Sequence, residues 1–123
     1  MTNESENMYC GAIKRGEVFI CDLAGKKAWA LVLQDNVLNG CLPTVVCAPI
    51  EPRKKTDRLY INEVVLPGVE TGLGKDGICL PYKIISIDRR RIIAKKGEVS
   101  KEKMAEVYQA LDITLGRFRD KKF

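Results

Sequence analysis

The clearest pattern in the chain is a pair of apolar runs, residues 29–33 and 45–50, on either side of a polar stretch. Each run has the length of a buried strand and is too short for a typical helix. The stretch between them contains turn-forming residues, among them Asp35, Asn36 and Pro43. This connection is too long for a tight hairpin. The pattern therefore predicts two strands joined by a loop that lies over the sheet.

Other parts of the chain also have the apolar pattern of strands, and a short link at residues 23–28 connects the first of them to the run at 29–33. The predicted strands cover residues 13–22, 59–66, 78–88 and 92–99. The first is apolar on both faces, which favours a strand that is covered on both sides. Pro81 interrupts the third, which marks an edge or a bulge in the sheet.

The last part of the chain has the period of an amphipathic helix. Ser100 is a good N-cap residue, and Gly116 marks the end of the predicted helix. Apolar side chains recur between them and just beyond at spacings of three and four, at Met104, Val107, Tyr108, Leu111, Leu115 and Phe118. We expect Leu111, at the centre of this stripe, to be buried against the strands.

Length and composition predict one soluble domain. The chain has 123 residues, and we expect a loose arm at 1–12 followed by one folded domain at 13–123. Its net charge of +5 is compatible with an acidic or nucleic-acid partner, and equally with an ordinary soluble surface. No apolar run approaches the roughly 20 residues that span a bilayer. The N-terminal residues are polar and acidic, unlike a signal peptide, so we expect no membrane contact and a cytoplasmic location.

The cysteines and the lack of histidine limit the possible chemistry. The chain has five cysteines, no pair at C-x-x-C spacing and no histidine, so we expect neither a metal site nor a cofactor. Cys21, Cys47 and Cys79 lie in apolar runs and are expected to be small buried hydrophobic residues. A glycine-rich segment at 67–77 lacks the spacing of a Walker motif, which argues against a nucleotide phosphate loop.

An ordered set of motifs gives the chain a resemblance to a known family. The segments RGEV, LVLQDN, LPTVV and ISIDRRRI, followed by the C-terminal helical pattern, resemble the MazF/PemK toxins of type II toxin–antitoxin systems. The resemblance runs from about Ile13 to Gly116. It implies an α+β, mainly β fold, namely a small, bent, SH3-like antiparallel barrel with a C-terminal helix, as in MazF and CcdB. It also implies a homodimer, a single-stranded RNA substrate, and an antitoxin with an acidic C-terminal tail.

The resemblance also implies a reaction, the cleavage of RNA without a metal by attack of a ribose 2′-hydroxyl on the adjacent phosphorus. This reaction needs a base, an acid and cations that stabilise the phosphoryl charge. The catalytic arginine of the family aligns with Ala28, and its catalytic threonine aligns with Glu51. Glu51 then becomes the candidate base, and Arg53 the candidate that holds the phosphoryl oxygens.

Further candidates would bind the RNA strand. Tyr82 could stack on a base. The cationic candidates for phosphate contacts are Lys26, Lys27, Lys54, Lys55, Lys83, Arg89 and Arg90. Each basic segment is also compatible with a solvated, charged turn.

Two other functions stay open at this point. Because Ala28 cannot supply a cation, the chain could bind nucleic acid or an antitoxin without cleaving RNA. A gyrase poison like CcdB would have the same fold. That protein ends in Trp-Gly-Ile, whereas this chain ends in RDKKF.

Overall fold

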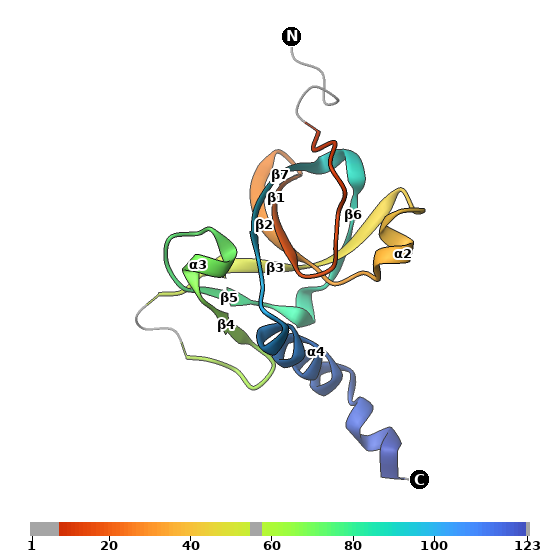
Figure 1. Ribbon diagram of the computed structural model, residues 1–123. Coiled ribbons are helices and arrows are strands. Elements are labelled where there is room, and N and C mark those ends of the chain that lie inside the picture. The colour runs from red at the N-terminus through yellow and green to blue at the C-terminus, as the bar shows by residue number, and fades with distance from the viewer. Residues whose placement is uncertain (1–7, 55–57, 123) are drawn as a thin grey trace.

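The computed structural model of the protein describes residues 8–54 and 58–122, which form a seven-stranded antiparallel sheet and a long C-terminal helix (Figure 1). The strands are β1 (Glu17–Leu23), β2 (Lys26–Val32), β3 (Thr44–Pro52), β4 (Val64–Leu66), β5 (Gly77–Cys79), β6 (Ile85–Asp88) and β7 (Ile92–Glu98). The helices are α2 (Asn36–Asn39), α3 (Gly68–Thr71) and α4 (Lys101–Leu115), with 3₁₀ turns η1 (Pro81–Lys83), η2 (Arg89–Arg91) and η3 (Arg117–Lys122). Lys55 lies outside the described residues.

The sheet bends into a small barrel around β3. The strand order is β4-β5-β3-β2-β1-β7, and β6 pairs with β3 off this path. The first part of β3 pairs with β6 and its last part pairs with β5, so this one strand belongs to both halves of the sheet. In Figure 1 the helix α4 lies below β4 and β5. This arrangement confirms the predicted mainly β barrel with a C-terminal helix.

Two apolar clusters hold the fold together, one on each face of the central strands. Alternate residues of β2 face opposite ways, so that Ala30 and Val32 join the cluster between β1, β2, β3, β6 and β7. Leu31 and Leu33 instead join the cluster that includes Val107 and Ala110 of α4. The burial of both faces explains why these strands are apolar on both sides.

The link between the first two strands is tighter than the sequence indicated. The strands β1 and β2 are joined by a two-residue turn, in which Ala24 and Gly25 both have positive φ angles, 54° and 82°. Such turns match the twist of a hairpin. The prediction that Lys26 and Lys27 lie on the turn is therefore wrong, because both belong to β2 and pair with Leu23 and Asp22.

Two predicted strands are shorter than expected. Only Val64–Leu66 of the segment 59–66 is a strand, because Glu63 folds back on Tyr60 through a main-chain bond of 3.0 Å and a side-chain bond of 3.0 Å. The segment 78–88 is divided into β5, η1 and β6, since Pro81 begins a 3₁₀ turn instead of continuing the ladder. Similarly, the polar connection at 34–44 contains the short helix α2.

The C-terminal helix begins and ends where the sequence predicted. The Ser100 hydroxyl accepts a hydrogen bond from the Lys103 amide, and Gly116 closes the helix in a left-handed conformation with φ of 70°. The predicted burial of the apolar stripe is only partly correct. Leu111 packs against the core but is half-buried, whereas Leu115 is 63% exposed.

The described end of the N-terminal segment rests on the barrel. The Tyr9 amide donates to the Ile92 carbonyl at 2.8 Å, and the Tyr9 ring meets Phe19 edge-on at 5.0 Å between centroids. Residues 1–7 of the predicted arm lie outside the described residues.

Candidate nucleic-acid interface

The two positions aligned with the family's catalytic residues lie next to each other across adjacent strands. Trp29 of β2 pairs with Ile50 of β3 in an antiparallel register. Continuing that register by one residue places Ala28 opposite Glu51, and alternation puts both side chains on the same face. The register thus places the two candidate positions side by side. The pair nevertheless consists of a methyl group and an exposed carboxylate.

Glu51 has a second set of polar neighbours beyond β3. It pairs with Ile78 of β5, and the turn η1 follows that strand. In η1 the Tyr82 hydroxyl donates to Glu63 Oε2 at 2.6 Å, and Glu63 Oε1 accepts from the Tyr60 amide. We call Glu51, Tyr60, Glu63 and Tyr82 the tyrosine–carboxylate group.

The proton of Tyr82 is held firmly in this group. The hydrogen bond to Glu63 raises the pKa of Tyr82 to about 12, with smaller contributions from burial and from the charges of Glu63 and Glu51. A phenol with so high a pKa is a weaker acid than an ordinary tyrosine. Its ring is 37% exposed, so stacking on a base remains the role that the geometry favours.

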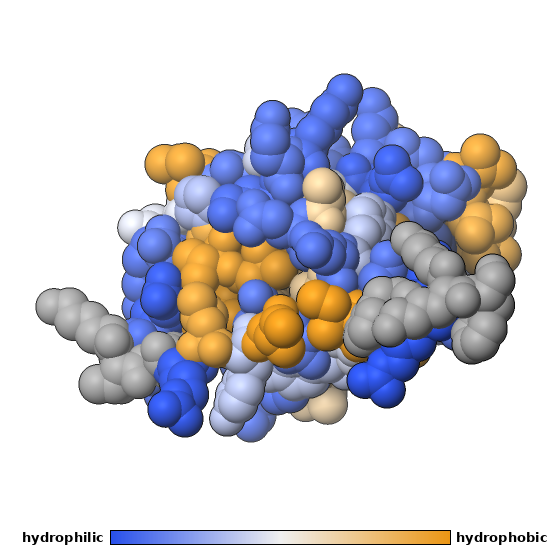
Figure 2. All heavy atoms as spheres, turned by 90° about the horizontal axis from the view of Figure 1, so that it is seen from below, coloured by the Kyte–Doolittle hydropathy of each residue, from blue (hydrophilic) through white to orange (hydrophobic). Residues whose placement is uncertain are grey.

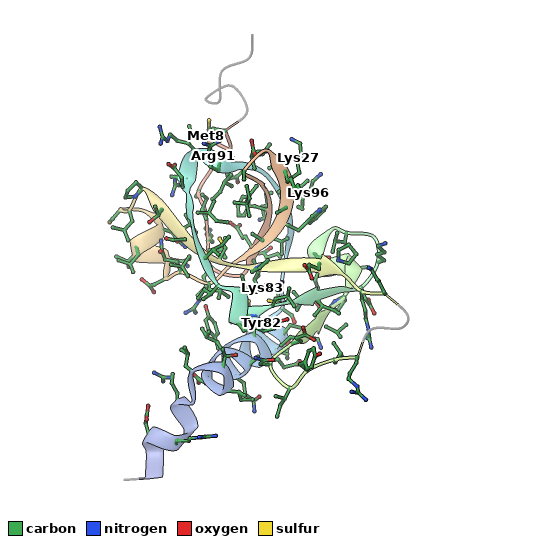
Figure 3. The ribbon with its side chains drawn as sticks, turned by 180° about the vertical axis from the view of Figure 1, so that it is seen from behind. Met8, Lys27, Tyr82, Lys83, Arg91 and Lys96 are labelled. Atoms are coloured by element: carbon green, nitrogen blue, oxygen red, sulfur yellow. The ribbon has the colours of Figure 1, made fainter. Side chains whose placement is uncertain are left out.

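Lysines and arginines gather at one end of β1. The turn before Lys26 and Lys27 lies at this end, and Cys21 of β1 pairs on its other side with Ile92, the residue after η2. Figure 3 shows Lys27 and Arg91 at this upper end of the barrel, on opposite sides of it. Two basic segments that are far apart in the sequence thus lie at the same end of the barrel, on opposite sides of it.

The other cationic candidates lie elsewhere. Arg53 and Lys54 are exposed beyond the end of β3, where the Arg53 amide donates to the Asp76 carbonyl at 2.9 Å. Lys83 lies beside Tyr82 in η1, which contacts α4, near the middle of the view in Figure 3. The predicted cations therefore lie on several elements and do not form one continuous patch around the Ala28–Glu51 pair.

Two of the predicted phosphate-binding arginines already have partners within the protein. Arg90 forms a bidentate pair with Asp88, in which Nη2 lies 2.8 Å from Oδ2 and Nε lies 3.2 Å from Oδ1. These hydrogen bonds lower the pKa of Asp88 to about 2. Arg89 donates from Nη1 to the Asn39 carbonyl at 2.6 Å. Both side chains are thus oriented by local contacts.

Sequence reasoning missed Glu63 and Tyr60. The segment that contains them alternates like a strand, and this pattern concealed the turn that Glu63 makes with Tyr60. The bond between Glu63 and Tyr82 joins residues 19 positions apart, and no spacing rule predicts it. Their acidic and phenolic character was the available signal.

The cysteines behave as expected. Cys21, Cys47 and Cys79 are buried, and burial raises the pKa of Cys21 and Cys79 to about 12 and that of Cys47 as well. In the part of the chain that the structure describes, no cluster of three His, Cys, Asp or Glu side chains is placed to hold a metal ion. Among the same residues, no helix is long and apolar enough to cross a membrane.

Known proteins are similar to the chain in both sequence and fold. Residues 14–115 match the family described as "PemK-like, MazF-like toxin of type II toxin-antitoxin system". The chain is 31% identical over 111 residues to "Endoribonuclease MazF" of Staphylococcus epidermidis, an alignment that covers 85% of this chain and 92% of that protein.

Solved structures extend the similarity. The MazE–MazF complex (Form-I) from Deinococcus radiodurans contains a chain with a TM-score of 0.71 and 28% identity, over 86% of this chain and 98% of that one. An endoribonuclease in complex with its cognate antitoxin from a mycobacterial species has a TM-score of 0.75 at 23% identity, over 85% and 96% of the two chains. The chain belongs to the PemK-like, MazF-like toxins of type II toxin–antitoxin systems.

Proposed function

We propose that the protein is a toxin that acts on single-stranded RNA in the cytoplasm and is neutralised by an antitoxin. The observation that carries this proposal is the register of β2 on β3, which, continued by one residue beyond Trp29 and Ile50, puts Ala28 opposite Glu51. These are the two positions that the resemblance aligns with the family's catalytic pair. The relative named "Endoribonuclease MazF" supports the RNA substrate, and the named toxin–antitoxin complexes support the partner.

The first candidate activity is cleavage of RNA without a metal. Glu51 is the base that takes the 2′-proton, and Arg53, two residues on, is the cation that holds the phosphoryl oxygens. The oxygen of the 2′-hydroxyl bonds to phosphorus, the bond to the 5′-oxygen breaks, and the product ends in a 2′,3′-cyclic phosphate. The Tyr82 hydroxyl donates a hydrogen bond to Glu63 and is therefore not directed at the substrate. Water is the better source of the proton for the leaving oxygen.

A second candidate is binding to RNA or to an antitoxin without cleavage. The specific observation in its favour is the methyl group of Ala28, which stands where the family places a cation. Proton transfer and charge stabilisation contribute separately to such reactions, so the loss of the cation alone lowers the rate strongly.

One experiment separates the candidates. The purified protein is incubated with a long mixed-sequence RNA, with and without a chelator, and the products are analysed for cyclic phosphate ends. Cleavage that is unchanged in chelator supports the first candidate. Intact RNA that is nevertheless bound supports the second, and RNA that is neither bound nor cut contradicts an RNA-directed function.

A further inference from the structure

An open pocket lies between the segment that leads into β1, the short helix α2 and the turn η2. Its volume is about 210 Å³, and its lining consists of Ala12, Ile13, Lys14, Asn36, Asn39, Gly40 and Arg89. The two charged residues in this lining are both cations, Lys14 and Arg89. The pocket is separate from the Ala28–Glu51 pair, because α2 adjoins the first residue of β3 whereas Glu51 lies near its last (Figure 1).

The guanidinium of Arg89 is held in place by the main chain. The Arg89 Nη1 donates to the Asn39 carbonyl at 2.6 Å. The backbone amide of Arg89 donates to the Pro43 carbonyl at 2.9 Å. Because one of five guanidinium N–H groups makes that side-chain contact, the rest of the fork can bind an oxyanion in a fixed orientation.

The support behind Arg89 is itself rigid. Asn39 is 1% exposed, and its side chain exchanges two hydrogen bonds with Gln34, of 3.0 and 2.9 Å. Gln34 also donates to the Thr44 carbonyl at 3.0 Å. This buried network fixes the carbonyl that orients Arg89, so the cation does not have to be ordered when a ligand binds.

Lys14 provides the second charge. Within the described residues its ammonium makes no hydrogen bond or ion pair, although its amide donates to Glu17 Oε1 at 2.7 Å. The Glu17 carboxylate is itself paired with Lys95 at 2.7 Å, so it does not neutralise Lys14. The pocket thus has two cations and no acidic residue in its lining.

The size of the pocket limits the ligand. Pockets for drug-sized ligands begin at roughly 300 Å³. A volume of about 210 Å³ therefore suits a phosphate group better than a whole nucleotide. We infer that the Lys14–Arg89 pocket binds a backbone phosphate of single-stranded RNA away from the Ala28–Glu51 pair. The inference that the ligand is RNA rests on the proposed function, whereas the inference of a phosphate site depends on the pocket alone.

The distance between the two sites sets the shortest RNA that can occupy both. Thr44, whose carbonyl belongs to the network behind Arg89, is seven residues from Glu51 along β3. Because Thr44 and Glu51 belong to one continuous strand, this is about 23 Å at roughly 3.3 Å per residue. A dinucleotide cannot reach both sites, whereas a longer extended strand can.

The phosphate site is tested with the full chain, labelled with ¹⁵N and titrated with inorganic phosphate against chloride at constant ionic strength. We expect saturable amide shifts at residues 12–14 and 36–40. Lys14→Ala, which removes no internal contact of the ammonium, should weaken binding about fivefold or more. Lys75→Ala removes an exposed lysine near α3, beyond the other end of β3, and should leave the affinity unchanged. Shifts that do not saturate, or that are identical in the two variants, would overturn the phosphate site.

The RNA assignment is tested with a fluorescent single-stranded oligonucleotide and a dinucleotide. For the oligonucleotide, Lys14→Ala should reduce the slope of log affinity against log salt by about one. The dinucleotide, which is too short to occupy both sites, should lose less affinity than the oligonucleotide on Lys14→Ala. If the pocket binds inorganic phosphate but Lys14→Ala leaves oligonucleotide affinity unchanged, the RNA assignment is overturned in favour of a free phosphate ligand. If the wild type binds no RNA at all, the proposed function fails, and the phosphate titration still decides the pocket.

Discussion

Under the proposed function, Ala28 and Glu51 are the two residues that determine what the interface can do chemically. The strand register that places them opposite each other is set by alternation and by the burial of Ala30 and Leu31 on opposite faces of β2. A slip of one residue in the pairing of β2 with β3 would place the two side chains on opposite faces. The packing of the core thus fixes where residues 28 and 51 lie, but it does not fix which amino acids occupy these positions.

Tyr82 gives the interface a dependence on alkaline pH. Its pKa in the folded protein is raised from 10 to about 12 by the bond to Glu63, so its contribution to stability is complete below pH 10 and is lost as the pH rises toward 12. We expect the wild type to lose more stability than Tyr82→Phe over this window. Urea melts at pH 9, 10 and 11 measure the difference. The buried cysteines titrate in both forms and cancel, and parallel pH curves for the two proteins would contradict the assignment.

The cysteines provide a test of burial at single residues. Cys10 and Cys41 are exposed, whereas burial raises the pKa of the Cys21, Cys47 and Cys79 thiols. Because the thiolate is the reactive form, a thiol reagent at pH 8 should modify two cysteines quickly and the other three only after denaturation. Five equal rates in the native protein would show that the described core is not closed.

At the scale of elements, α4 depends on a few residues that dock it on the sheet. Val107 is fully buried against the cluster with Leu31 and Ala48, so Val107→Ala should cost about 1.5–3 kcal/mol. Leu111→Ala should cost less than a fully buried leucine, near the low end of about 2–5 kcal/mol, because Leu111 is half-buried. Urea unfolding midpoints at constant slope measure both.

Leu115→Ala is the matched control for α4. Its side chain is 63% exposed, so the substitution should change stability by less than about 0.5 kcal/mol. If Leu115→Ala were as costly as Val107→Ala, the docking face of the helix would be different from the one described.

Elements with local signals were the ones that the sequence predicted well. The helix α4 has a cap at Ser100 and a stop at Gly116, which act within one turn of the chain. The segment 59–63 alternates like a strand, but no neighbouring strand pairs with it in the described residues, so the turn between Tyr60 and Glu63 replaces the ladder. Hydrophobic alternation reports burial, not the presence of a partner strand.

The candidate site was predictable only in part, for a related reason. The Ala28–Glu51 pair follows from strand register, which the apolar pattern sets. The bond between Tyr82 and Glu63 depends on how two loops close, and the anchoring of Arg89 on Asn39 depends on the position of α2. Such contacts between distant irregular segments have no period in the sequence.

At the scale of the molecule, we expect a homodimer, as the family resemblance implies. Ile84 and Ile85 are 40% and 38% exposed at the start of β6, which pairs only with β3 within the described residues. An apolar edge of this kind is commonly covered by a partner. Figure 2 shows further apolar side chains gathered on the face seen from below.

Light scattering at micromolar concentration tests the dimer. We expect twice the 13.8 kDa of one chain for the wild type and a shift toward 13.8 kDa for Ile85→Lys. Val69→Lys is the control, since Val69 is exposed on α3, away from β6. A wild type that is monomeric throughout would contradict the dimer.

Cleavage of single-stranded RNA at the Ala28–Glu51 pair is the central reaction to be tested. The most direct measurement is the cleavage rate in chelator of wild type and Glu51→Gln, with RNA affinity measured in parallel. We expect Glu51→Gln to cleave at least about tenfold more slowly with nearly unchanged affinity, since it keeps the shape of the side chain and removes the base. Arg53→Ala should lower both rate and affinity. Equal cleavage rates for the wild type and Glu51→Gln would contradict the assignment of the base, and a wild type that binds RNA but leaves it intact would contradict cleavage itself.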